Sequence, residues 1–168
     1  MLSIIVAAST NMVIGKDNKL LWHIPSDLKN FKDLTFGKRV YMGRNTWESL
    51  PEKYKPLPNR DNVVITRDKT YKANGAAVIT DLDMIKRAFE LSSFNLGYRE
   101  HFVIGGGEIY KELFPIAHKL YLTEVLTEVE GDTYLEGFNE EEWVKTYESD
   151  IYEENGFKYR FKYFVRKS

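Results

Sequence analysis

One carboxylate in this sequence is placed to bind a ligand or take part in catalysis: Asp27, in the segment from Gly15 to Phe36. Pro25 suits the first position of a helix, where a missing N–H costs nothing, and Leu28 and Phe31 follow it at helical spacing. Asp27, Leu28 and Phe31 therefore share one face of the predicted helix. A carboxylate on that apolar face could hydrogen-bond a flat, amine-bearing ligand that lies against Phe31.

A second interpretation of Asp27 is structural. An acid in the first turn of a helix complements the positive end of the helix dipole. The preceding loop, Gly15 to Ile24, mixes turn residues with Leu20, Leu21 and Trp22, so it carries apolar side chains toward the helix start. The rest of the chain decides between the two interpretations.

The composition predicts one folded domain, residues 1–168, with a full hydrophobic core. The net charge is −1, from 24 basic and 25 acidic residues, so no general attraction to nucleic acid or to a membrane is expected. The absence of cysteine excludes disulfides, thiolate metal sites and a thiol nucleophile. We expect no metal site, no secretory signal and no membrane-spanning segment, and hence a cytoplasmic protein.

Hydrophobic runs of strand length alternate with helical patterns along the chain. The predicted strands are Leu2 to Ala8, Arg39 to Met42, Asn62 to Thr66, Ala76 to Ile79, His101 to Ile104 and Lys119 to Val125, with a possible strand near Thr133-Tyr134. After Pro25, further helices are predicted at Trp47 to Leu50, from Asp81 to about Leu91, and between the glycines at 105–107 and Pro115. The apolar face of the third helix is expected to carry Leu82, Ile85, Ala88 and Phe89.

The C-terminal part has a different pattern. Trp143 to Tyr147 and Phe157 to Val165 alternate with a period of two around Asn155-Gly156, which is a strong hairpin signal. The predicted fold class is therefore α/β: a mostly parallel central sheet with helices on both faces and an antiparallel C-terminal edge hairpin.

Three segments with phosphate-binding chemistry follow predicted strands. They are Gly43-Arg44, Thr66-Arg67 and Gly105 to Gly107. Ligands of open α/β sheets bind beyond the carboxyl ends of the strands, where free N–H groups at helix starts and arginine side chains both suit phosphate. Each segment alone is compatible with an ordinary turn. Their convergence at one sheet edge predicts a phosphorylated ligand.

The triple glycine partly matches the dinucleotide fingerprint G-x-G-x-x-G. Gly105 and Gly107 fit its first half, and Glu124 lies near the distance expected of a ribose-binding acid, but Tyr110 stands in place of the third glycine. A standard Rossmann dehydrogenase is therefore not supported. The two arginines favour a phosphorylated ribose instead.

Together these residues closely resemble the dihydrofolate reductase family, over nearly the whole chain. The matching segments, in the family's order and spacing, are V-I-G-K-D-N-K-L-L-W-H-I-P-S-D-L-K-N-F-K (13–32), M-G-R-N-T-W-E-S-L (42–50), P-L-P-N-R (56–60), V-I-G-G-G-E-I-Y (103–110), L-Y-L-T (120–123) and E-G-D-T (130–133). The resemblance implies NADPH-dependent reduction of 7,8-dihydrofolate to tetrahydrofolate, in support of one-carbon metabolism. It also leads us to expect a monomer.

The resemblance implies specific roles. Asp27 would bind the pterin's 2-amino group and N3, Thr123 would assist it, and Trp22 would hold a water, so these three are the predicted catalytic residues. Arg60 resembles the arginine that pairs with the α-carboxylate of the glutamate tail. The implied substrate pocket comprises Ile5, Val6, Asp27, Leu28, Phe31, Leu50, Leu57, Arg60, Ile104 and Thr123. The residues implied to hold NADPH are Ala7, Ile14, Gly15, Gly43, Arg44, Asn45, Thr46, Thr66, Arg67, Gly105, Gly106, Gly107, Glu108, Ile109 and Tyr110, with a cis peptide at Gly105-Gly106.

The chemistry fits this interpretation, since a nicotinamide would supply the hydride and the protein need only align the reactants and exclude water. The proton for N5 is expected from a water admitted by the Gly15 to Ile24 loop, with Asp27 setting the local field. Three positions depart from the family's commoner pattern. Leu21 replaces a proline, His23 is expected to be a solvated surface residue, and Glu108 stands where many members have Arg or Gln beside the cofactor phosphates, so it would repel NADPH or point to solvent.

Two alternatives remain at this point. A related reductase that acts on a pyrimidine intermediate of riboflavin synthesis would keep the cofactor glycines but would not need Asp27 with Phe31 and Arg60. A non-catalytic nucleotide-binding module would need neither the pterin carboxylate nor a gating loop that bears Trp22.

Overall fold

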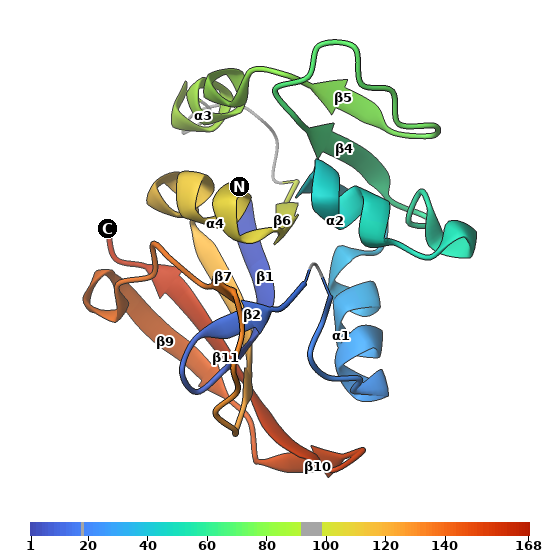
Figure 1. Cartoon of the computed structure of the whole chain (residues 1–168). Helices are drawn as coiled ribbons and strands as arrows, with labels where there is room; N and C mark the ends of the chain where they lie inside the picture. Colours follow the sequence, from blue (N-terminus) through green and yellow to red (C-terminus); the bar gives the residue numbers. More distant parts are fainter. Residues whose placement is uncertain (18, 92–98) are drawn as a thin grey trace.

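The computed structural model describes residues 1–17, 19–91 and 99–168. Asn18, within the predicted Gly15 to Ile24 loop, lies outside the described residues. The fold is a large twisted sheet with helices against both of its faces (Figure 1).

Parallel strands form the centre of the sheet, in the order β7-β1-β6-β3-β4-β5. β1 (Leu2–Ser9) lies between β7 (Lys119–Val125) and β6 (His101–Gly105), and β6 is followed by β3 (Arg39–Gly43), β4 (Asp61–Ile65) and β5 (Ala77–Ile79). β1 is mostly apolar and buried along nearly its whole length, because it is covered on both faces and has parallel neighbours on both sides. All six predicted strands are confirmed to within one residue at each end.

Antiparallel strands complete the sheet beyond β7. β11 (Phe157–Arg166) pairs with β7, and both β9 (Trp143–Glu148) and β10 (Tyr152–Glu154) pair with β11. The turn between β10 and β11 is Asn155-Gly156, and both residues have the positive φ that a tight hairpin requires. The predicted fold class is confirmed, although the short strand β10 was not expected.

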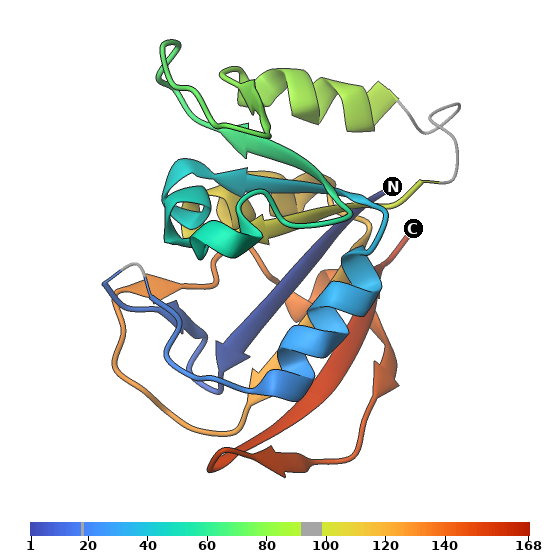
Figure 2. The same cartoon turned by 90° about the vertical axis from the view of Figure 1, so that its right-hand side faces the viewer.

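The helices divide between the two faces, because successive strand side chains point to opposite sides. α1 (Pro25–Thr35) and α2 (Arg44–Ser49) pack on one face, where the cluster includes Ile5, Val64 and Phe102. Figure 2 shows α1 running alongside the strands of that face. α3 (Leu82–Leu91) and α4 (Gly107–Leu113) pack on the other face with Ile4 and Val63.

Local details differ from the predictions in a few places. α2 begins at Arg44, directly after Gly43, and not at Trp47. Ala88, expected on the buried face of α3, is exposed, because the contact of α3 with the sheet is a narrow stripe through Ile85 and Phe89. The remaining elements are a second small sheet of β2 (Val13–Gly15) and β8 (Thr133–Tyr134), and the 3-10 turns η1 (Glu52–Tyr54), η3 (Phe114–Ile116) and η4 (Glu140–Glu142). None of the helices in the described ranges has the length and apolar character needed to cross a membrane.

Candidate functional site

Asp27 and Thr123 are in direct contact. The hydroxyl of Thr123, on β7, donates a hydrogen bond of 2.6 Å to Oδ1 of Asp27, in the first turn of α1, across 96 residues of sequence. Thr123 is buried and Asp27 is half-buried. Burial raises the pKa of the Asp27 carboxyl, and the hydrogen bond from Thr123 offsets part of that shift. A helix-dipole partner at the surface needs neither burial nor a bound hydroxyl.

The position of Asp27 depends on the residue that starts its helix. The carbonyl of Ile24 accepts hydrogen bonds from the N–H groups of Asp27 (2.9 Å) and Leu28 (3.1 Å). The Ile24 side chain is 2% exposed and packs in a cluster with Trp22, Val125 and Tyr159. One buried side chain therefore holds the first turn of α1 against the sheet and directs Asp27 toward β7.

An apolar wall lies beside this carboxylate. Most of the residues that the sequence predicted for it belong to one cluster on the α1 face: Ile5, Phe31, Leu50, Leu57 and Ile104. The side chain of Val6 packs in the cluster of the opposite face, as alternation along a strand requires, and its role in the pocket stays a prediction. Leu28 is 47% exposed, and it lies at the open side of the wall.

Arg60 lies at the far end of α1 from Asp27. Its Nε donates to the carbonyl of Pro58 (2.9 Å), one terminal nitrogen donates to the hydroxyl of Thr35 (3.3 Å), and its guanidinium lies 5.7 Å from the ring centre of Phe31. Burial lowers its pKa. Within the described part of the chain no carboxylate pairs with Arg60. The side chain is thus oriented and partly desolvated, with its charge available to an anionic ligand.

Two glycine turns meet at the carboxyl ends of β3 and β6. A Cβ at Gly43 would lie 3.2 Å from Cγ1 of Ile109, so the start of α2 approaches α4 closely. Gly105 has a φ of +133°, which favours glycine, and the Gly105-Gly106 peptide is cis as the resemblance implied. Thr46 places its hydroxyl against both of these glycines. Glycine at these positions therefore lets the starts of α2 and α4 pack closely together at this edge.

Tyr110 connects the glycine edge to the apolar wall. Its hydroxyl donates a 2.8 Å hydrogen bond to the carbonyl of Ile5, and the side chain is buried. Burial raises the pKa of Tyr110 far above its usual range, so it stays a neutral donor. Tyr110, which stands in place of the third glycine of G-x-G-x-x-G, therefore links α4 to β1.

The two arginines at this edge are paired with acids. Arg44 contacts Glu48 (3.0 Å) and Asp68 (3.4 Å), and its guanidinium lies 4.3 Å from the ring centre of Tyr71. Arg67 contacts Glu108 at 3.0 Å. Glu108 was expected either to repel the cofactor or to point to solvent; its side chain is largely exposed, in agreement with the second expectation, and it also pairs with Arg67.

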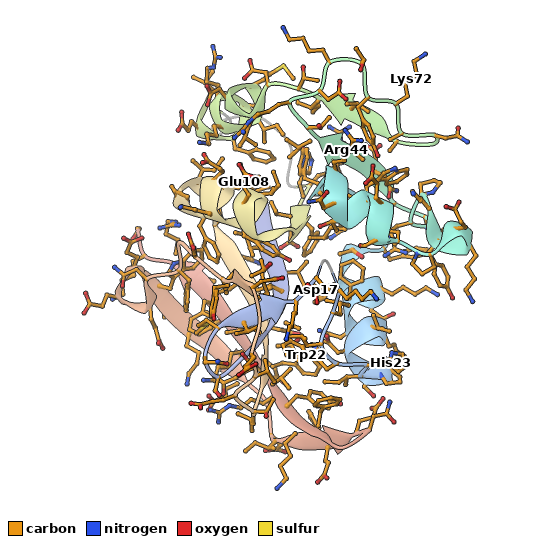
Figure 3. The ribbon with its side chains drawn as sticks, viewed as in Figure 1. Asp17, Trp22, His23, Arg44, Lys72 and Glu108 are labelled. Atoms are coloured by element: carbon orange, nitrogen blue, oxygen red, sulfur yellow. The ribbon has the colours of Figure 1, made fainter. Side chains whose placement is uncertain are left out.

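Hydrogen bonds hold both ends of the loop before α1. At one end the backbone N–H of Asp17 donates to Asp132 (2.8 Å), and Gly15 pairs with Thr133. At the other end the side chain of Asn155 donates to the carbonyl of His23 (3.1 Å), whose own side chain is exposed as expected. Trp22 is 7% exposed. Figure 3 shows Asp17, Trp22 and His23 along this loop beside α1.

The other predicted cofactor residues surround the same edge. Ile14 is buried, Ala7 packs against the Trp22 cluster, Thr66 follows β4, and Asn45 is exposed in α2.

The sequence analysis missed two acids that hold the loop before α1 and the start of that helix. Asp132, which accepts the hydrogen bond from Asp17, was part of the E-G-D-T match and could have been singled out. Nothing in the sequence indicated that Glu154 accepts a hydrogen bond from the N–H of Ser26 (3.1 Å). In the described ranges no group of three His, Asp or Glu side chains could hold a metal ion.

Comparison with known proteins gives one consistent result. A family model described as dihydrofolate reductase matches residues 1–166. The dihydrofolate reductase of Bacillus subtilis (strain 168) is 39% identical over 170 residues, covering 100% of this chain and 96% of its own. That of Haemophilus influenzae is 42% identical over 170 residues, with 98% of each chain covered. A solved structure of dihydrofolate reductase from Enterococcus faecalis, complexed with NADP(H) and RAB-propyl, superposes with a TM-score of 0.85 at 32% identity, covering 100% of this chain and 97% of that one.

Proposed function

This chain belongs to the dihydrofolate reductase family, and from that premise we propose that it reduces 7,8-dihydrofolate to 5,6,7,8-tetrahydrofolate with NADPH. The observation that carries the proposal is the contact between Asp27 and Thr123. A carboxylate with a raised pKa, fixed beside an apolar wall, suits the amine-bearing edge of a pterin. The riboflavin-type reductase and the non-catalytic module require no such group.

Asp27 and Thr123 orient the substrate. Thr123 occupies one oxygen of the carboxylate, which leaves the other oxygen for the 2-amino group and N3 of the ring. Removal of water strengthens these hydrogen bonds, since the effective dielectric constant falls on burial. The ring then lies against Phe31 and the wall of Ile5, Leu50, Leu57 and Ile104, with Leu28 at its open side.

Arg60 binds the glutamate tail of the substrate. Its guanidinium is already oriented by Pro58 and Thr35, and a bidentate pair with an α-carboxylate is the interaction that arginine forms best. The tail would thus lie along α1, from the pterin at its first turn to the arginine near Thr35.

The residues at the strand ends fit NADPH. Side chains are absent at Gly43 and Gly105, where a Cβ would come within 3.3 Å of Ile109 or Thr46, so these glycines let α2 and α4 begin close together at the strand ends. The sequence-predicted set from Ala7 to Tyr110 would hold the cofactor, with Arg44 and Arg67 near its phosphorylated ribose. When bound, the nicotinamide supplies the hydride that C6 of the pterin receives.

Protonation of N5 completes the reaction. Asp27 binds the edge of the ring that lies away from N5, so it does not reach N5 directly. Its charge influences the protonation of N5 through the local electric field, and a water molecule donates the proton. The loop that carries Trp22 controls the access of that water, because both of its ends are held by hydrogen bonds that can open, to Asp132 and Asn155. We assign Asp27, Trp22 and Thr123 as the catalytic residues on this basis.

We also propose that residues 1–168 act as a single cytoplasmic domain, as a monomer that binds no nucleic acid. The net charge of −1 supports the last point, since nucleic-acid binding relies on excess positive charge. Sedimentation of the purified chain would measure the oligomeric state.

One assay tests the main proposal. NADPH absorbance should fall on addition of dihydrofolate, and the product should be tetrahydrofolate. The matched control is Asp27→Asn, which keeps the shape of the side chain and should be nearly inactive at neutral pH. If the parent chain leaves NADPH unchanged while folded, the proposed function is wrong.

A further inference from the structure

The ion pair between Arg67 and Glu108 lies across the proposed cofactor edge. Arg67 follows β4 and Glu108 is in the first turn of α4, 41 residues later, and their side chains meet at 3.0 Å. Both are largely exposed, at 93% and 70% of their side-chain area. Figure 3 shows Glu108 over α4 and Arg44 over the start of α2, on either side of the strand ends.

Arg67 is held much more loosely than Arg44. Arg44 has two acids and an aromatic ring around it, and its partner Glu48 is itself fixed by the hydroxyl of Tyr71 at 3.1 Å. Glu108 is the acid that pairs with Arg67 in the described part of the chain. An exposed pair of this kind contributes little to stability, because water screens it. Arg67 therefore has fewer contacts to exchange for a ligand than Arg44 has.

The surroundings of Glu108 make that exchange unfavourable for the acid. A hollow of about 370 Å³ beside the start of α4 is lined by Glu108, Asp132, Glu136 and Lys111 among others, and Lys111 is already paired with Glu136 at 3.1 Å. When Arg67 leaves, Glu108 remains near two other acids and next to a new anion. The loss of its partner is then a cost that any ligand of Arg67 must offset.

We propose that Glu108 is a specificity-determining residue for the cofactor: it competes with the ribose 2′-phosphate for Arg67 and thereby limits the preference for the phosphorylated dinucleotide. A phosphate carries more charge than a carboxylate and forms stronger charge-assisted hydrogen bonds with arginine, so it displaces Glu108. A dinucleotide without the 2′-phosphate leaves the Arg67–Glu108 pair intact. This inference rests on the proposed function.

The test is calorimetric titration of the parent protein and of Glu108→Gln with NADP⁺ and with NAD⁺. Glu108→Gln frees Arg67, so NADP⁺ should bind about two- to fivefold more tightly, with little change for NAD⁺. The gain should shrink at high salt, since exposed charges are screened. An unchanged affinity for NADP⁺, or an equal gain for both dinucleotides, contradicts the inference.

Two further variants separate competition from a general charge effect. Glu112→Gln removes the same charge from α4, but its ion-pair partner is Lys86 at 2.8 Å and it reaches Arg67 only through a weaker charge interaction, so its gain in affinity for NADP⁺ should be clearly smaller than that of Glu108→Gln. In an Arg67→Ala background, Glu108→Gln should have no effect, and a full effect there would show simple repulsion and overturn the competition. If the parent binds neither dinucleotide, the proposed function fails; if it binds NADP⁺ and Glu108→Gln changes nothing, only this inference fails.

Discussion

Asp27 and Arg67 are both charged residues of the candidate site, yet their surroundings differ in almost every respect. Asp27 is half-buried, receives one short hydrogen bond from a buried threonine, and has a raised pKa. Arg67 is 93% exposed and pairs with an acid that is 70% exposed. In the proposed site, the pterin half depends on a single half-buried carboxylate, whereas the phosphate half has arginines in exposed ion pairs. Substitutions should therefore have large effects in the first region and small ones in the second.

The largest effect is expected for Asp27→Asn. The substitution keeps the size of the side chain but removes the charge that influences N5, so turnover at neutral pH should fall by roughly 10²–10⁴-fold, the range for general acid–base assistance. The loss should be smaller at acid pH, where solvent protonates the substrate. A pH–rate profile measures this. Asp33→Asn, which alters an exposed pair with Lys29 on the same helix, is the control. Profiles of equal height and shape for Asp27→Asn and the parent would falsify the mechanism.

The next largest effect concerns Arg60. Loss of a charge-assisted pair is worth roughly 1.5–3 kcal/mol, so Arg60→Ala should raise KM for dihydrofolate at least about tenfold with a much smaller change in kcat. Steady-state kinetics with a dihydropterin that lacks the glutamate tail provide the comparison, because the KM for that substrate should not change. An equal loss with both substrates would mean that Arg60 only supports the fold near Thr35 and Phe31.

A smaller effect is expected at the phosphate edge. Because Arg44 and Arg67 are exposed and already paired with acids, the double substitution to alanine should reduce the preference for NADPH over NADH by about five- to tenfold. The ratio of kcat/KM for the two cofactors reports this. Arg39→Ala, at the opposite end of the sheet and paired with Asp61, should leave the ratio unchanged. Equal use of both cofactors by the parent protein would contradict the role of the arginines.

The smallest expected effect is on the stability of the fold, which Asp27→Asn should increase at neutral pH and not reduce. The pKa of Asp27 is raised in the folded state from 3.8, so folding favours its protonated form. The stability from this group is fully present below pH 3.8 and is lost as pH rises through the folded pKa, by about 1.4 kcal/mol for each unit of pKa shift. Asp27→Asn cannot ionise. It should therefore resist urea better than the parent at pH 7 and equally well below pH 3.8, and a less stable variant at pH 7 would contradict this assignment.

Much of the site could be predicted because it depends on local patterns. Pro25, Leu28 and Phe31 placed Asp27 in the first turn of a helix, and the structure has that helix at Pro25–Thr35. Glycines after β3 and β6 do meet at one edge. The side chain of Val6 points to the face opposite that of Ile5, because successive side chains of a strand alternate, and its implied role stays a prediction. The contact between Thr123 and Asp27 and the pairing of Arg67 with Glu108 were beyond any local pattern, whereas Arg44 and Glu48 form an (i, i+4) pair within α2.

Sequence alone determined the order of the elements, the α/β class and the residues able to do the chemistry, because periodicity, turn residues and helix starts act over a few neighbouring positions. Only the tertiary structure decided how those residues are charged and paired. The Thr123–Asp27 bond spans 96 residues and the Arg67–Glu108 pair spans 41. The pKa of a carboxyl depends on how much water the assembled fold removes from it, and the partner of an exposed arginine depends on which acid the packed helices bring within reach.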